Sequence, residues 1–103
     1  MEYRQLGTSG LEVSVLGLGG TNFGTRADDA LAATIIDSAI DRGINLIDTA
    51  NIYSAGKSEE AIGKALVGKR DQVVLTSKFG QRTGDAPMMS GGSRRHIMKA
   101  VED

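Results

Sequence analysis

Cysteine is absent from the 103-residue sequence, and proline occurs only once. Without cysteine the chain can form no disulfide, no thiolate nucleophile and no cysteine-based zinc site, which favours a reducing compartment such as the cytoplasm. There is no run of roughly 18 apolar residues, and residues 1–5 are of mixed polarity rather than basic and then apolar. We therefore expect neither a membrane span nor a signal peptide.

A strong charge of either sign is also missing. The 12 lysines and arginines nearly balance the 13 acidic residues, which leaves a formal net charge of -1. Such a balance gives no general electrostatic reason to expect nucleic acid or an anionic membrane as a partner. We expect no nucleic-acid partner, no membrane partner and no metal site. The length predicts a single domain.

What the sequence does contain is a hairpin pattern at its start. Apolar and polar residues alternate on both sides of the turn at residues 7–10, with Tyr3 and Leu6 before it and Leu11 and Val13 after it. We assign residues 1–15 to this hairpin.

A strand and helix pattern then repeats along the chain. Short apolar runs predict strands, and apolar residues at helical spacing predict the helices between them. The first unit has a buried strand at 15–19, a glycine-rich loop at 20–24 and a helix over 28–42. The second has a strand at 44–48 and a helix that starts at Ser58 and ends at Gly68.

The third unit follows the same order. Residues 72–77 predict a strand, a glycine-rich connection covers 79–92, and Ser93 is expected to cap a helix with an apolar stripe of Ile97, Ala100 and Val101. That pattern is still helical at residue 103, so we expect this helix to be incomplete.

Alternating strands and helices predict a parallel sheet with right-handed crossovers, in a barrel or in an open doubly wound sheet. Periodicity does not choose between the two. A complete eight-unit barrel needs about 250 residues, so three units would be somewhat under half of one. Alone, such a partial sheet would expose two edges.

The glycine-rich loop after the first strand invites comparison with a dinucleotide-binding loop. After Gly17 and Gly19, however, the third glycine of a G-x-G-x-x-G motif should stand where Asn22 is found. We therefore interpret this segment as a flexible loop, in which a ligand could still approach the backbone of Gly20 and Thr21.

Asp48, Tyr53 and Lys78 are the strongest candidates for chemistry. Asp48 and Lys78 close two successive predicted strands, and the carboxyl ends of parallel strands share one edge, where α/β proteins place their active sites. Tyr53 follows in the loop over 49–57 and can fold back over that edge. The three residues could share one pocket.

A tyrosine hydroxyl can give a proton to a carbonyl oxygen as hydride reaches the carbon, but the reference pKa of tyrosine is about 10. A neighbouring ammonium favours the phenolate form, and a carboxylate keeps the ammonium charged and oriented. The same residues also suit an ordinary ion pair beside a half-buried loop aromatic. Residue types alone leave both interpretations open.

A family resemblance bears on this choice. The stretches DTANIY at 48–53 and SEEAIGKAL at 58–66 closely resemble the aldo-keto reductase signature. Further similar segments are YRQLG at 3–7, GLGG at 17–20, RDQVV at 70–74, TSKF at 76–79 and SRRHI at 93–97. The resemblance covers essentially the whole chain.

The resemblance implies an α/β fold, namely the N-terminal part of a (β/α)8 TIM barrel, with residues 1–103 as one partial barrel and residues 15–103 as its first three units. It implies an oxidoreductase that uses NADPH to reduce aldehydes or ketones. Tyr53 would be the proton donor, with Asp48 and Lys78 as its tuning partners. Gly20, Thr21 and Asp48 would lie near the nicotinamide.

The family also uses a histidine from the strand after the third helix. His96, the only histidine, falls within that helix, and a helix packed outside the sheet cannot readily reach the carboxyl edge. We predict that His96 is a surface residue without a catalytic role. The alternative function is an inactive barrel fragment that self-associates or pairs with a complementary segment to cover its open edges.

Overall fold

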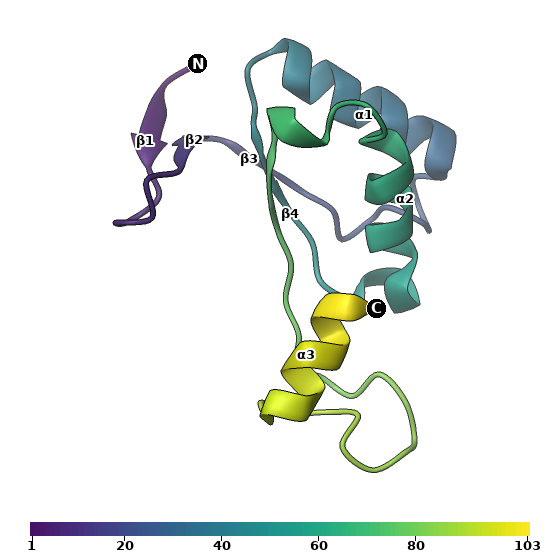
Figure 1. Ribbon diagram of the computed structural model, residues 1–103. Coiled ribbons are helices and arrows are strands. Elements are labelled where there is room, and N and C mark those ends of the chain that lie inside the picture. Colours follow the sequence, from purple (N-terminus) through teal and green to yellow (C-terminus); the bar gives the residue numbers. More distant parts are fainter.

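A small antiparallel hairpin precedes a parallel sheet in the computed structural model, which describes all 103 residues (Figure 1). Strands β1 (Tyr3–Gln5) and β2 (Glu12–Ser14) pair with Arg4 opposite Val13, which confirms the predicted hairpin. Figure 1 shows the hairpin set apart from the helices.

Asn45 anchors this hairpin to the parallel sheet. Its side-chain oxygen accepts from the Ser14 backbone N–H at 2.7 Å, and its side-chain nitrogen donates to the Glu12 carbonyl at 3.0 Å. The Tyr3 hydroxyl adds a bond to the Gly43 carbonyl at 2.8 Å. The hairpin is therefore held at the end of the sheet where the parallel strands begin.

Three short strands make up the parallel sheet. They are β3 (Gly17–Gly19), β4 (Leu46–Asp48) and β5 (Val74–Thr76), in the order β3-β4-β5. Gly19 lies opposite Asp48, and Asp48 lies opposite Thr76. Because the strands are parallel and in register, all three carboxyl ends stop at one level of the sheet.

Helices follow each strand, as predicted. They are α1 (Asp29–Asp41), α2 (Lys57–Ala65) and α3 (Arg94–Glu102). The carboxylate of Asp28 accepts from the Leu31 N–H at 2.9 Å to cap α1, and the Ser93 hydroxyl accepts from the His96 N–H at 3.1 Å to cap α3. The predicted Ser93 cap is confirmed. None of these helices is long and apolar enough to cross a bilayer.

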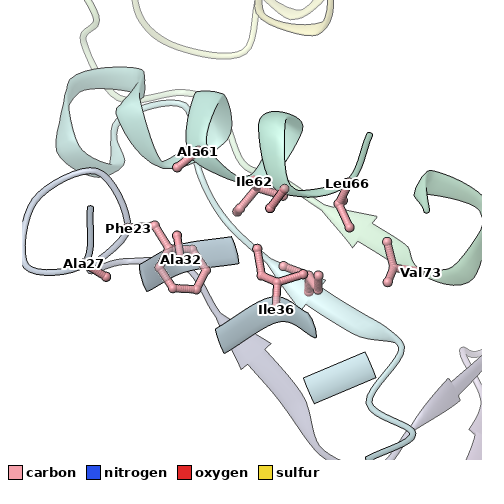
Figure 2. Close-up of a cluster of buried hydrophobic side chains, with 10 residues drawn as sticks. Phe23, Ala27, Ala32, Ile36, Ala61, Ile62, Leu66 and Val73 are labelled. Atoms are coloured by element: carbon pink, nitrogen blue, oxygen red, sulfur yellow. The ribbon is translucent and has the colours of Figure 1, made fainter. Parts of the chain in front are cut away.

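Most of the core lies between the sheet and the helices α1 and α2, which pack against each other (Figure 2). Ile36 of α1, Ile47 of β4 and Ile62 of α2 are almost fully buried. The remaining members of the cluster are Phe23, Ala27, Ala32, Ala61, Ala65, Leu66 and Val73. This packing fixes α2 over the strand ends that carry the candidate site.

All three predicted strands are longer than the observed ones, and β4, predicted over 44–48, starts at Leu46. Residues 15–19 were expected to form a buried strand, but β3 covers only Gly17–Gly19, and Val15 and Leu16 lie in a bend before it and are 46% and 59% exposed. The third strand was expected from Gln72, but residues Arg70–Gln72 form a short turn of 3-10 helix, and β5 starts at Val74. There the Arg70 side chain donates to the Val73 carbonyl at 3.1 Å.

Candidate active site

The carboxyl edge of the sheet brings Asp48 and Lys78 together, as predicted. Asp48 is the last residue of β4, and Lys78 follows β5 by two residues. Strand-like pairing continues past the strands, since Thr49 N–H donates to the Thr76 carbonyl at 2.8 Å and Asn51 N–H donates to the Lys78 carbonyl at 3.1 Å. The backbone therefore holds the two functional side chains in a defined relation.

Lys78 is bound on two sides. Its ammonium donates to Oδ2 of Asp48 at 2.6 Å and to the carbonyl of Thr49 at 2.6 Å. The hydrogen bond to Asp48 is the main reason that the pKa of Lys78 lies above its ordinary value of 10.5, and Tyr53 raises it further. Lys78 is therefore cationic at neutral pH, and the exposure of half of its side chain to solvent also favours the charged form.

Asp48 has a second donor that sequence inspection missed. The Thr76 hydroxyl donates to Oδ1 at 2.8 Å, while Lys78 occupies Oδ2. The hydrogen bond from Lys78, helped by the one from Thr76, places the pKa of Asp48 below its ordinary value of 3.8, against the opposing effect of partial burial. Both carboxylate oxygens are thus engaged, and Asp48 is an anion whose orientation is set by two residues of the neighbouring chain segment.

Tyr53 lies above the ammonium of Lys78, which is 4.9 Å from the centroid of the tyrosine ring. The chain turns sharply directly after it. Ser54 and Ala55 adopt left-handed conformations with φ of 51° and 55°, and Gly56 follows with φ of 91° before α2 begins. Left-handed backbone is costly for residues with a Cβ atom, and such strain often occurs at functional sites. The structure thus brings Asp48, Tyr53 and Lys78 together, as predicted.

Gly20 and Thr21, at the end of β3, complete this edge. The Gly20 N–H donates to the Asp48 carbonyl at 2.8 Å, so the loop is bonded directly to β4. Gly20 is buried, whereas Thr21 is exposed. At Gly20 a Cβ atom would lie 3.0 Å from the Ser58 hydroxyl and 3.1 Å from Cδ1 of Ile62. Close packing of α2, and not only ligand approach, therefore favours glycine at position 20.

A shallow cavity of about 160 Å³ lies beside Tyr53 and Lys78, where Phe79, Ile52 and Gln81 also contribute to its walls. Small-molecule sites usually enclose about 300–1,000 Å³. The cavity beside the candidate proton donor is therefore smaller than a typical small-molecule site.

The prediction that His96 is a surface residue is wrong. Only 5% of it is exposed, and its ring packs edge-on against Phe79 at 6.3 Å between centroids. Its Nε2 atom is buried without a hydrogen-bond partner. The buried face of α3 is centred on His96, so the predicted stripe shifts: Ile97 and Ala100 are half-buried, and Val101 is 78% exposed. His96 makes no hydrogen bond to Asp48, Tyr53 or Lys78.

Sequence inspection also missed the role of Ser58. It predicted that Ser58 starts the second helix, but α2 starts at Lys57 and no side chain caps it. The Ser58 hydroxyl instead points into the protein and donates to the Gly20 carbonyl at 2.8 Å. A serine at a predicted helix start was the only signal, and it is the usual signal for a cap.

Comparison with known proteins finds related sequences and structures. The family model for the aldo/keto reductase family matches residues 15–103. An uncharacterized oxidoreductase of Bacillus subtilis, YqkF, is 44% identical over 85 residues, which cover 82% of this chain and 27% of that protein.

Two solved structures share the fold. The aldo-keto reductase AKR11C1 of Bacillus halodurans, in its holo form, matches with a TM-score of 0.86 and 40% identity over 99% of this chain and 34% of its own. A candidate aldo-keto reductase from Pseudomonas aeruginosa matches with a TM-score of 0.83 and 44% identity over 97% of this chain and 38% of its own.

The chain belongs to the aldo/keto reductase family. Its three strand and helix units are part of the α/β TIM barrel of that family, as predicted, and the family is one of oxidoreductases. The chain spans about a quarter to two fifths of the length of these relatives.

Proposed function

We propose that Asp48, Tyr53 and Lys78 serve an NADPH-dependent reduction of aldehydes or ketones to alcohols. The observation that carries this proposal is the shared ammonium of Lys78, which bonds to Asp48 at 2.6 Å and lies 4.9 Å from the centre of the Tyr53 ring. The left-handed turn at Ser54 and Ala55, directly after Tyr53, also supports the proposal, because such strained backbone often occurs at functional sites.

Tyr53 is the general acid of the proposed reaction. Its hydroxyl gives a proton to the carbonyl oxygen while the carbonyl carbon gains hydride, and the resulting phenolate is reprotonated from solvent. The Lys78 ammonium stabilises that phenolate, and Asp48 keeps Lys78 charged and in place. A reduced nicotinamide supplies the hydride when bound.

Open space at the strand ends supports the proposal of a nicotinamide site. Asp48 is half-exposed, Thr21 is exposed, and a Cβ atom at Gly19 would have no other atom within 4 Å. This leaves open space at the ends of β3 and β4, beside the lysine and tyrosine. Gly20, Thr21 and Asp48 would contact that end of the cofactor. NADPH is proposed because the family uses it, and the cysteine-free composition favours a cytoplasmic enzyme.

Replacement of the Tyr53 hydroxyl tests the proposal. In the complete gene product, Tyr53→Phe should lower kcat for carbonyl reduction by about 10²–10⁴-fold, the usual contribution of a positioned general acid. Quenching of NADPH fluorescence should be nearly unchanged. Tyr3→Phe is the matched control, because it removes a hydroxyl that bonds only to Gly43, in the hairpin region. Full turnover in Tyr53→Phe would exclude Tyr53 as the acid.

A second candidate is a non-catalytic module that associates with another copy or with a complementary segment. Its support is that β3 and β5 each have one unpaired edge, which favours further strand pairing. Sedimentation and NADPH titration of the 103-residue chain separate the two candidates. An oligomer without affinity for NADPH supports the module, whereas a monomer that binds NADPH at micromolar concentration counts against it.

A further inference from the structure

The first turn of α2 contacts the segments that follow all three parallel strands. Ser58 bonds to Gly20 after β3 and to Thr49 after β4, and Glu59 bonds to Ser77 after β5. In the sequence, each of these three contacted residues is next to a residue of the proposed site. Gly20 precedes Thr21, Thr49 follows Asp48, and Ser77 precedes Lys78.

The Ser58 contact is fully buried. Ser58 and Thr49 are 0% and 1% exposed, and their hydroxyl oxygens are 2.7 Å apart. A serine hydroxyl has a single proton, and Ser58 donates it to the Gly20 carbonyl at 2.8 Å. The Thr49 hydroxyl is therefore the donor in its bond to Ser58. This chain of bonds has one direction, from Thr49 through Ser58 to Gly20.

Gly20 is consequently held from two sides. Its carbonyl accepts from Ser58, and its N–H donates to the Asp48 carbonyl at 2.8 Å. Loss of the Ser58 hydroxyl would leave the buried Thr49 hydroxyl without its acceptor, and a buried polar group without a partner is costly. The Gly20 carbonyl would keep only its bond from the Phe23 N–H at 3.0 Å, within its own loop, and would lose its bond to α2.

Glu59 makes the corresponding contact with β5. Its Oε1 accepts from the Ser77 hydroxyl at 2.5 Å, next to Lys78. Glu59 is half-buried and Ser77 is exposed, whereas Ser58 is fully buried. The Glu59 bond by itself is therefore weaker evidence for positioning than the Ser58 bond. Together the two neighbouring residues give α2 a bond to every strand end of the site.

We propose that Ser58 and Glu59 are positioning residues of the reductase, with Ser58 aligning the Gly20–Thr21 loop with Asp48 and Glu59 aligning Lys78. This inference rests on the proposed function, because alignment matters to catalysis only if these residues bind cofactor and move a proton. A displacement of about 1 Å in an active site can cost about 100-fold in rate, which makes remote positioning residues measurable.

The two residues should give different kinetic effects in the complete gene product. Ser58→Ala should raise the Kd for NADPH about tenfold or more, because the loop that contacts the nicotinamide is released. Glu59→Ala should lower kcat with little change in that Kd, because Lys78 shifts relative to Tyr53. Glu59→Gln keeps an oxygen that can accept from Ser77, so it should restore most of the lost kcat.

Ala65→Gly is the matched control, since it weakens the same helix at its other end, where the side chain belongs to the apolar core. Ser58→Cys is the milder second variant if Ser58→Ala does not fold, because a thiol is a weak donor to the Gly20 carbonyl but fills a similar shape. An equal NADPH Kd in Ser58→Ala and Ala65→Gly would overturn the proposal for Ser58. A kcat in Glu59→Gln as low as that in Glu59→Ala would overturn the proposal for Glu59.

Amide hydrogen exchange separates this inference from the proposed function. The Gly20 N–H, bonded to Asp48, should exchange faster in Ser58→Ala and in Ser58→Cys than in Ala65→Gly. If the unchanged protein neither binds NADPH nor reduces carbonyls, the proposed function fails and the kinetic role fails with it. Unchanged Gly20 exchange in both variants would show that Ser58 does not hold the loop.

Discussion

The ammonium of Lys78 lies 2.6 Å from the carboxylate of Asp48, across the gap between the ends of two adjacent parallel strands. Neither residue is deeply buried, so this pair is not primarily a source of stability. Its geometric effect is to place a positive charge directly beneath the ring of Tyr53.

The first prediction concerns the pH range of this pair. The pKa of Asp48 is lowered, so its stabilising effect is present above the unfolded value of about 3.9 and is lost as the pH falls through the folded value. The pKa of Lys78 is raised, so its effect is present below about 10.4 and is lost as the pH rises through the folded value. We expect the ion pair to contribute fully from about pH 4 to pH 10, and to be lost only at pH values below the ordinary pKa of Asp48 and above that of Lys78.

NMR titration of the Lys78 side chain checks this expectation. Asp48→Asn should lower the pKa of Lys78, because the main cause of its increase is the bond to Asp48. Asp29→Asn is the control, because Asp29 pairs with Lys64 at 2.7 Å instead. A Lys78 titration that is the same in both variants would contradict the assigned cause.

The second prediction compares two glycines near α2. Gly24 has a φ of +78°, and a Cβ there would lie 2.4 Å from Cβ of Lys57 and 2.9 Å from its backbone carbon. Gly24→Ala should therefore lower the free energy of unfolding by more than about 1 kcal/mol. At Gly63, inside α2, a Cβ would meet no atom within 4 Å, so Gly63→Ala should raise it by about 0.5–1 kcal/mol.

Urea denaturation measures both changes. We expect the two substitutions to change the free energy of unfolding in opposite directions. Both replace a hydrogen with a methyl group, and only the local backbone conformation and the free space differ. Equal effects would mean that the close approach of the loop at residue 24 to Lys57 does not occur in solution.

The third prediction concerns the buried histidine. His96→Leu should change the free energy of unfolding by less than about 1 kcal/mol, because it removes a buried polar atom without a partner but also the aromatic contact with Phe79. Carbonyl reduction by the complete gene product should persist in this variant. A loss as large as that of Tyr53→Phe, with folding intact, would instead assign His96 a part in catalysis.

Much of the fold followed from local pattern. The hairpin, the order of strands and helices and the Ser93 cap were all predicted, because turn residues, apolar periodicity and capping side chains act over a few neighbouring residues. The meeting of Asp48 and Lys78 was also predictable, since carboxyl ends of adjacent parallel strands share an edge. The roles assigned to these side chains remain predictions.

Side-chain partners distant in the sequence could not be predicted in this way. His96 has the pattern of an exposed helical residue, but tertiary packing, which includes the edge-on contact with Phe79, buries it. Ser58 has the pattern of a helix cap, yet its hydroxyl faces the Gly20 carbonyl, 38 positions away. Local periodicity carries no information about which distant groups will lie opposite a given side chain.

Residue pattern was thus enough to place Asp48, Tyr53 and Lys78 near one edge, because strand direction and loop length follow from local sequence. How these three side chains are arranged at that edge was decided by the tertiary structure. A left-handed turn at Ser54 and Ala55 leads from Tyr53 into α2, and the packing of α2 brings Ser58 against the strand ends. A burial or a hydrogen bond between distant segments depends on how whole helices dock on the sheet, which no short window of sequence encodes.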